Sequence, residues 1–474
     1  MCTGRVSFDD EAGNVIGVAD LSGGTAQLKR SDLPVRLYKI KAVYLGGSGW
    51  PTVGVCPGSE SDLLSLTVAK ADTTTTVTSS ANPSVYGQAV TFSATVAPNP
   101  VRTGSTTPTG IVTFRADGIH LGTEALDGSG VAIFTTSSLA AGPRTISAAY
   151  GGDANYNTST GTLNQTVNKA NTATTLSSSV NPSVYGQTAS FIATVAAVAP
   201  SDGVPAGTVT FKDGGEPIGV APLSGSHIAA FRLYRFAGTT LAGSSVAVLN
   251  ISSLAAGPHS ITAEYSGHSH FNASTSASLS QMVNKAATTT TITSDAPDAS
   301  VVGQPVEVRF TVVAVAPGSG APLGNVTVSD GGGNSCSGTV PVGKCMLTPT
   351  SAGAKTLTAS YAGDSKFNTS SGSASHQVNK ADTTTTIISD TPDPSVTGQA
   401  VTVNYSVVAN APGSGAPTGN VTVDDGEGNS CSATVAVGKC TLTPTSAGTK
   451  TLTASYAGDS NFSASSDTEP HQVN

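Results

Sequence analysis

The sequence predicts an all-β protein built from tandem β-sandwiches. Three observations lead to this fold class. A group of motifs recurs in fixed order at intervals of roughly one hundred residues, apolar and polar residues alternate along the candidate strands, and turn-forming residues separate these runs. The composition agrees, because Gly, Thr and Ser are abundant while charged residues make up only 11% of the 474 residues, and helices favour Leu, Glu and Lys.

Three motifs recur in the same order along the chain. The first is Pro-Ser-Val-x-Gly-Gln, the second is (Ile/Leu)-x-Ala-x-Tyr-x-Gly, and the third is Val-(Asn/Ala)-Lys-Ala. The first begins at Pro83, Pro182 and Pro394, with a variant at Ala299; the second ends at Gly46, Gly152, Gly267, Gly363 and Gly458; the third begins at Val68, Val167, Val283 and Val378.

The spacing of the third motif sets the size of the repeat. Its lysines are Lys70, Lys169, Lys285 and Lys380, which lie 99, 116 and 95 residues apart. This length suits a seven-stranded sandwich and exceeds the short units of a solenoid. The predicted domains are residues 1–70, which hold an incomplete copy, followed by 71–169, 170–285, 286–380 and 381–474.

Within a repeat the hydrophobic period is two. Val90, Phe92, Ala94 and Val96 alternate with Thr, Ser and Thr. Such alternation places one face of a strand on a core and the other in water, which is typical of antiparallel sheets. Turn dipeptides such as Asp117-Gly118 separate these runs. We expect about seven strands in each full repeat and no helix.

A tyrosine ends the second motif's inward-facing run, just before a glycine turn. There a phenol can bury its ring and direct its hydroxyl to the backbone, as at a tyrosine corner. We therefore expect these tyrosines to be structural, with ligand stacking as the alternative. They are Tyr44, Tyr150, Tyr265, Tyr361 and Tyr456.

Two repeats contain a closely spaced cysteine pair. Cys336 and Cys345 recur at the same spacing as Cys431 and Cys440, each time within Gly-Asn-Ser-Cys and Val-Gly-Lys-Cys. One close pair per domain indicates a local disulfide formed in an oxidising compartment. A zinc site is the alternative, but neither pair has a further Cys or His at ligand spacing.

The motifs resemble the tandem bacterial immunoglobulin-like repeats of large secreted and surface proteins. The resemblance is carried by Asn-Pro-Ser-Val-Tyr-Gly-Gln from Asn82 and Asn181, by Gly-Thr-Val-Thr-Phe-Lys-Asp-Gly from Gly207, and by the segment from Ser252 to Tyr265. It covers essentially the whole chain. It implies immunoglobulin-like sandwiches in an elongated array, with spacer, stalk or adhesion roles and no catalytic residues.

The first copy is expected to lack its first strands. Gly4 to Phe8 aligns with segments that lie in the middle of later copies, as expected if the reading frame is clipped or its start misassigned. This also accounts for the absence of a visible signal peptide. In an immunoglobulin-like sandwich the loops that carry Cys2 and Cys56 lie at one end, so a third disulfide is a further expectation.

The third repeat carries an insertion near residues 226–242. It includes Phe231-Arg232-Leu233-Tyr234-Arg235-Phe236. We interpret it as a lengthened hairpin whose aromatics pack on their own domain. A recognition loop is the alternative, because loops on a rigid scaffold often carry function.

No residue is predicted to be catalytic, to bind a cofactor or to hold a metal. His268 and His270 are a candidate metal pair, but they occupy a loop that reads Gly-Asp-x-x in other copies, so we interpret them as sequence drift. The chain lacks Gly-x-Ser-x-Gly, a P-loop and a dinucleotide fingerprint. The sequence therefore does not predict an enzyme.

Two pairs of aspartates precede the first motif in the last two repeats. Asp295 and Asp298 correspond to Asp390 and Asp393. Their interpretation is turn and cap chemistry, which Asp-rich loops commonly show. Calcium bound between domains is the alternative.

These observations predict a non-catalytic structural or adhesive stalk module of a larger extracellular or cell-surface protein. The alternatives are spacer or accessory domains of a secreted enzyme such as a carbohydrate-active hydrolase, and carbohydrate binding, which the scarcity of aromatics disfavours. The expected partners are neighbouring domains of the same polypeptide and, at most, an unknown protein or glycan. Nucleic acid is not expected, because the net charge is -8 without a basic stripe, and no stretch is apolar enough to insert in a membrane.

Overall fold

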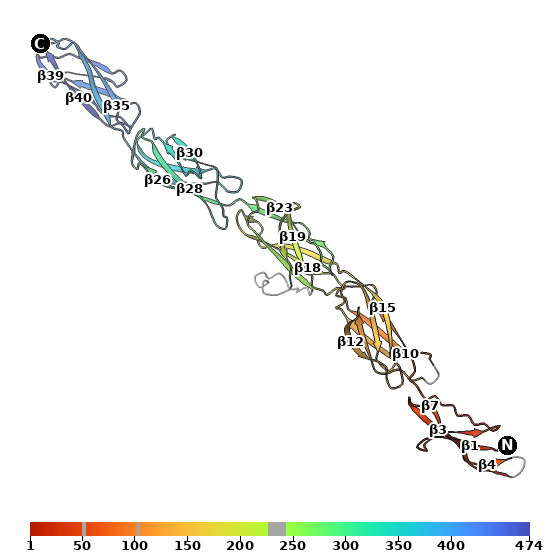
Figure 1. Ribbon diagram of the computed structural model, residues 1–474. Helices are drawn as coiled ribbons and strands as arrows, with labels where there is room; N and C mark the ends of the chain where they lie inside the picture. The colour runs from red at the N-terminus through yellow and green to blue at the C-terminus, as the bar shows by residue number, and fades with distance from the viewer. Residues whose placement is uncertain (50–53, 102–104, 226–242) are drawn as a thin grey trace. The chain divides into compact units, whose positions relative to one another are not determined.

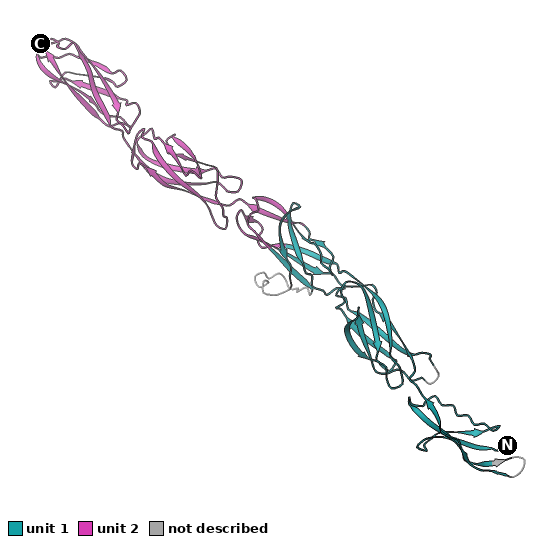
Figure 2. Ribbon diagram, viewed as in Figure 1, with its two compact units in different colours: residues 1–176, 192–248, 262–277 teal, residues 177–191, 249–261, 278–474 magenta. Residues whose placement is uncertain are grey.

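The computed structural model describes residues 1–49, 54–101, 105–225 and 243–474 (Figure 1). In these residues the regular structure consists of β-strands, and no helix is long and apolar enough to cross a membrane. The all-β prediction is confirmed. The chain divides into two compact units, residues 1–176 with 192–248 and 262–277, and residues 177–191 with 249–261 and 278–474 (Figure 2).

The first segment, before the first full repeat, forms one principal sheet of order β2-β1-β3-β6, in which β7 also pairs with β3. A separate ribbon joins β4 to β5. Val6 and Tyr38 are buried on this sheet, whereas Leu64 is 70% exposed. The strands are β1 (Gly4–Asp10), β2 (Val15–Leu21), β3 (Leu37–Tyr44), β4 (Gly47–Gly49), β5 (Gly54–Cys56), β6 (Ser59–Glu60) and β7 (Leu64–Thr67).

The second repeat is a sandwich of two sheets. One has the order β13-β10-β8 and the other β12-β11-β14-β15-β9, in which the short β9 runs parallel to β15. The strands are β8 (Thr73–Ser79), β9 (Ser84–Val85), β10 (Val90–Pro98), β11 (Ile111–Ala116), β12 (Ile119–Ala125), β13 (Val131–Thr136), β14 (Gly142–Tyr150) and β15 (Ser159–Asn168).

The third repeat has sheets of order β16-β18-β22-β21 and β17-β25-β23-β19-β20, with β24 on β23. The predicted insertion at 226–242 lies outside the described residues. The strands are β16 (Thr172–Ser178), β17 (Ser183–Val184), β18 (Ala189–Ala197), β19 (Thr208–Asp213), β20 (Glu216–Pro222), β21 (Ser224–Gly225), β22 (Ser244–Ile251), β23 (Gly257–Tyr265), β24 (Ser274–Thr275) and β25 (Leu279–Asn284).

The fourth repeat has sheets of order β26-β28-β31 and β27-β33-β32-β29-β30. Its first strand and its last strand therefore belong to opposite sheets. The strands are β26 (Thr288–Ala296), β27 (Ser300–Val301), β28 (Val306–Ala314), β29 (Asn325–Ser329), β30 (Ser335–Thr339), β31 (Lys344–Leu347), β32 (Gly353–Tyr361) and β33 (Ser370–Asn379).

The fifth repeat has the same topology, with sheets of order β34-β35-β38 and β37-β36-β39-β40. Ser395 forms an isolated parallel bridge to Val473, at the place that β27 occupies in the fourth repeat. The strands are β34 (Thr383–Thr391), β35 (Val401–Ala409), β36 (Asn420–Asp424), β37 (Ser430–Thr434), β38 (Lys439–Leu442), β39 (Gly448–Tyr456) and β40 (Ser465–Val473).

The alternation of the sequence accounts for the cores. In β10 the residues Val90, Phe92, Ala94 and Val96 are buried between the two sheets, and the intervening residues face outward. The corresponding strand buries one aromatic ring in every full repeat, at its second inward-facing position in the second and third repeats and at its third in the fourth and fifth. Burying such a ring contributes roughly 1.5–3 kcal/mol to the free energy of unfolding. These rings are Phe92, Phe191, Phe310 and Tyr405.

Candidate functional site

The predicted tyrosines lie at the edge of the core, before a turn. Four of them donate a hydrogen bond from the hydroxyl to a backbone carbonyl: Tyr44 to Thr3, Tyr150 to Thr109, Tyr265 to Ala206, and Tyr361 to Leu323, at 2.7 to 2.9 Å. The Tyr456 hydroxyl is buried near the Thr418 backbone and the Asp459 carboxylate without a hydrogen bond of regular geometry. Burial raises the pKa of Tyr361 and of Tyr456 to about 12.

The turn after each tyrosine is organised by an aspartate in three repeats. Asp459 Oδ1 accepts hydrogen bonds from the backbone N–H groups of Asn461 and Phe462, and its Oδ2 accepts from the backbone N–H and the hydroxyl of Thr418. Desolvation acts to raise the pKa of Asp459, but these hydrogen bonds outweigh it and hold the pKa at about 2. Asp153 and Asp364 make similar contacts.

The six cysteines form three disulfides, Cys2–Cys56, Cys336–Cys345 and Cys431–Cys440. Cys336 lies on β30 and Cys345 on β31, which belong to different sheets of the fourth repeat. The fifth repeat repeats this arrangement on β37 and β38. These two disulfides therefore join the sheets of a sandwich and do not close a two-stranded hairpin.

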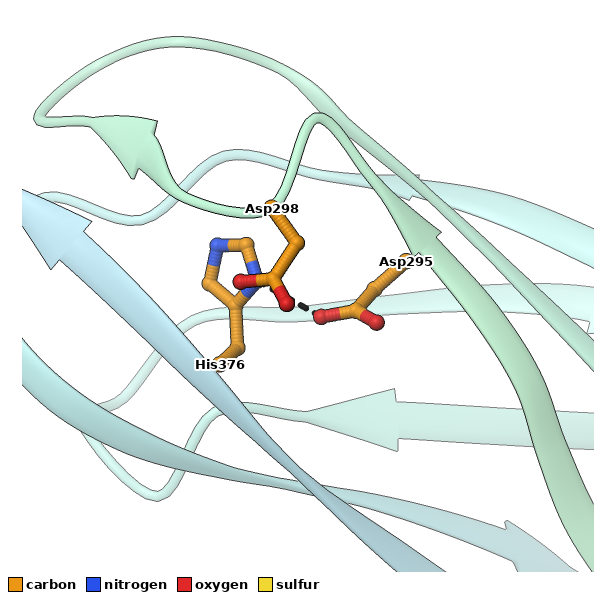
Figure 3. A group of neighbouring side chains, drawn as sticks. All are labelled: Asp295, Asp298 and His376. Carbon is orange, nitrogen blue, oxygen red and sulfur yellow. Dashed lines mark hydrogen bonds and ion pairs between the residues drawn. The ribbon is translucent and has the colours of Figure 1, made fainter.

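The aspartate pair of the fourth repeat converges on a buried histidine. Asp295 lies near the end of β26, Asp298 follows in the turn before β27, and His376 is on β33 (Figure 3). The imidazole Nδ1 of His376 lies 2.6 Å from Asp295 Oδ2 and 3.4 Å from Asp298 Oδ1. Its Nε2 lies 2.8 Å from Ser300 Oγ. The His376 side chain is fully buried, whereas that of Asp298 is half exposed.

The fifth repeat builds the same group from different residues. His471 Nδ1 lies 2.5 Å from Asp390 Oδ2 and 3.4 Å from Asp393 Oδ1, and its Nε2 lies 2.8 Å from Ser395 Oγ. The backbone N–H of Gln472 also donates to Asp393 Oδ1. We call the two groups, Asp295/Asp298/His376 and Asp390/Asp393/His471, the His–Asp–Asp triads.

The second and third repeats fill the histidine position with glutamine. Gln165 Nε2 donates to the Ala81 carbonyl and to Ser84 Oγ. Gln281 makes the corresponding bonds to Val180 and Ser183. In all four repeats this side chain therefore links the last strand to the segment that follows the first strand.

A metal ion is commonly held by three or more His, Cys, Asp or Glu side chains. Among the described residues, two groups of this kind could hold a cation, and they are the two triads. In each triad the three ligand atoms lie within 4.8 Å of one another. His268 and His270 belong to neither group. The arrangement offers one imidazole nitrogen and two carboxylate oxygens as ligand atoms.

The two triad histidines are absent from the residues predicted from the sequence. A signal for them exists, because His376 and His471 begin His-Gln-Val-Asn, where earlier repeats read Gln-Thr-Val-Asn and Gln-Met-Val-Asn. The position faces inward by the period of two, so a polar residue there requires a partner. Pairing that residue with aspartates some 80 residues earlier needed the sandwich topology.

Comparisons with known proteins identify the repeat. The model of the bacterial Ig-like domain (group 3) family matches residues 77–168, 176–284, 292–379 and 388–474. No curated protein matches the chain. The matches to this family model cover well over half of the chain, which confirms the resemblance inferred from the motifs.

Several solved structures of tandem immunoglobulin-like domains are also similar. The N-terminal eight Ig domains of Down Syndrome Cell Adhesion Molecule have 14% identity and a TM-score of 0.23, over 99% of this chain and 56% of that one. Invasin, a bacterial integrin-binding protein, has 14% identity and a TM-score of 0.34, over 84% and 79%. The Escherichia coli adhesin FdeC has 14% identity and a TM-score of 0.20, over 64% and 96%. The family assignment rests on the four tandem matches to the family model: the chain belongs to the bacterial Ig-like domain (group 3) family.

Proposed function

We propose that this chain is a non-catalytic stalk segment of a larger bacterial extracellular or cell-surface protein. The observation that carries the proposal is the way in which one repeat follows another. β15 ends at Asn168 and β16 begins at Thr172, and the next two junctions, from Asn284 to Thr288 and from Asn379 to Thr383, have the same length. Such junctions leave few rotatable bonds.

The lysine of each junction is held by the repeat that follows it. Its Nζ donates a hydrogen bond to the carbonyl that begins the turn after the tyrosine motif of that repeat. The pairs are Lys70 with Asp153, Lys169 with His268, Lys285 with Asp364, and Lys380 with Asp459, at 2.5 to 3.0 Å. The junction is thus part of the next sandwich, which favours a semi-rigid spacer over a flexible linker.

The disulfides support an extracytoplasmic location. Disulfides persist in oxidising compartments and are rare in the cytosol. The two that join opposite sheets lie in the fourth and fifth repeats, where they would hold the sandwich together outside the cell. Four tandem domains of this family favour a role in reach or adhesion.

Small-angle X-ray scattering on the full chain tests the stalk directly. Strands of up to ten residues rise about 3.3 Å per residue, so with loops one repeat is roughly 35–40 Å long and four repeats span on the order of 150 Å. The expected radius of gyration is roughly 40 Å or more. A compact globule of this length would instead give about 23 Å, and that result would contradict the proposal.

A junction variant provides the control. Insertion of ten Gly-Ser residues after Asn379 adds a flexible segment with an r.m.s. span of about 18 Å while leaving both flanking sandwiches intact. We expect the distance distribution of the variant to broaden relative to that of the parent chain. Equal breadth would show that the natural junctions are already as flexible as a Gly-Ser linker.

A further inference from the structure

The three positions of the His–Asp–Asp triads change together between repeats. The second and third repeats hold neutral side chains at all three positions, and the fourth and fifth hold ligand-forming side chains at all three. The neutral sets are Ser79/Asn82/Gln165 and Ser178/Asn181/Gln281; the triads are Asp295/Asp298/His376 and Asp390/Asp393/His471.

The fold itself does not require the charged set. Gln165 already links the last strand to the segment after the first strand through the Ala81 carbonyl and Ser84 Oγ. In the triad, His376 keeps the serine contact through Nε2 but directs Nδ1 at two carboxylates (Figure 3). A ring nitrogen carries at most one hydrogen, so it can satisfy one carboxylate well, and the second carboxylate adds negative charge beside a buried ring.

From these observations we propose that each triad binds one divalent transition-metal cation such as Zn²⁺, through His Nδ1 and one oxygen of each aspartate. An imidazole nitrogen with two carboxylates suits zinc and its first-row neighbours. Calcium and magnesium take oxygen ligands. The proposal thus replaces the calcium alternative considered for these aspartates.

The geometry requires a small adjustment. Zinc–nitrogen and zinc–oxygen bonds of about 2.0–2.2 Å place tetrahedral ligand atoms roughly 3.3 Å apart. The distance from His376 Nδ1 to Asp298 Oδ1 is already 3.4 Å, and that to Asp295 Oδ2 must open from 2.6 Å. Asp298 is half exposed, which leaves a route for the cation and room for a water as fourth ligand.

The serine supplies the support that a metal-bound histidine needs. A ligating imidazole normally donates its other N–H to a fixed acceptor, which sets the tautomer and the ring orientation. Ser300 Oγ and Ser395 Oγ lie 2.8 Å from the Nε2 atoms of His376 and His471, respectively. With Nε2–H donated to serine, the Nδ1 lone pair faces the carboxylates.

A bound cation would connect the two sheets of each sandwich. Asp295 lies near the end of the first strand, in one sheet, and His376 lies on the last strand, in the other sheet. If the chain is a stalk, these are the strands through which tension enters and leaves the domain. That consequence rests on the proposed function, whereas the metal site itself does not.

Isothermal titration of the metal-free full chain with ZnCl₂ tests the proposal. We expect two sites per chain that the parent has and that the H376Q/H471Q variant lacks, with one site left in either single variant. Glutamine is the residue that the second and third repeats carry at this position, so the variant keeps the strand-linking contact. Titration with CaCl₂ is expected to give no binding at these sites.

A second variant distinguishes loss of the metal site from misfolding of the H376Q/H471Q variant. D298N/D393N changes half-exposed side chains to the asparagine that the neutral repeats carry, and it is expected to weaken zinc binding at least tenfold without altering the β-sheet circular dichroism spectrum. The proposal is overturned if the parent chain takes up no zinc, or if both double variants retain the parent stoichiometry, in which case the zinc binds at other side chains. Neither outcome bears on the scattering test of the stalk.

Discussion

Single polar side chains do much to define the ends of each sandwich. Asp459 illustrates this, because one carboxylate accepts hydrogen bonds from two backbone N–H groups in its own turn and from the N–H and hydroxyl of Thr418. The carboxylate thus closes the turn that follows Tyr456.

The stability of the fifth repeat should depend on pH through this carboxylate. Its pKa is about 2 in the folded chain against an ordinary value of 3.8, and a depressed folded-state pKa adds stability that is present above the ordinary value and lost as the pH falls toward the folded value. We expect the parent to exceed D459N in unfolding free energy at pH 5, with a difference that shrinks toward pH 2.

Hydrogen exchange followed by mass spectrometry would measure the unfolding free energy of each repeat separately in the parent chain and in D459N. The third repeat carries His268 at the same position, so its exchange serves as an internal control that D459N should leave unchanged. A difference between parent and variant that stayed constant from pH 5 to pH 2 would argue against the depressed pKa.

Tyr361 and Tyr456 occupy equivalent positions in two repeats but differ in the hydrogen bonding of their hydroxyls. Tyr361 donates to the Leu323 carbonyl, whereas the buried Tyr456 hydroxyl makes no regular hydrogen bond. Loss of a satisfied buried hydroxyl costs about 1 kcal/mol, and loss of an unsatisfied one costs little or stabilises. We expect Y361F to lower the unfolding free energy of its repeat and Y456F to leave it equal or higher, as measured by hydrogen exchange. Equal losses would contradict the structural distinction.

At the scale of strands, the disulfides of the last two repeats act across the sandwich. Cys336 on β30 and Cys345 on β31 are separated by 9 residues in sequence but lie in different sheets. The chain-entropy model assigns such a closed loop about 2.5 kcal/mol. In the second and third repeats packing holds the two sheets together, whereas in the fourth and fifth a disulfide also joins them.

Removal of one disulfide should therefore affect one repeat. The variant C336A/C345A is expected to lose about 2.5 kcal/mol of unfolding free energy in the fourth repeat, while the fifth repeat, with Cys431–Cys440 intact, keeps the parent value. Hydrogen exchange of peptides from both repeats provides the measurement and its control. An equal loss in the two repeats would indicate that they unfold as a single cooperative unit.

At the scale of the whole molecule, the junctions between repeats are tied to the domains by their lysines. The predicted domain ranges end at the junction lysines, yet each of these side chains contacts the repeat that follows it. The junction is therefore shared: its covalent position closes one domain, and its hydrogen bond belongs to the next. At the last three junctions three residues separate the last strand of one repeat from the first strand of the next, and the proposed stalk rests on this short spacing.

Much of the architecture could be read from sequence because its determinants are local. Alternation at period two reports which face of a strand is buried, and the burial of Phe92 between outward-facing neighbours follows from it. Repetition then supplied the number of full sandwiches, since each copy carries its own set of inward-facing residues and its own tyrosine turn.

The relations between distant strands were decided only by the tertiary structure. The closely spaced cysteines pointed to a local disulfide, but which sheets it joins depends on how the sandwich folds over. His376 and Asp295 are 81 residues apart, and only the packing of the last strand against the end of the first brings them together. A local pattern records which side of a strand faces the core, but it carries no record of which strand it will meet there.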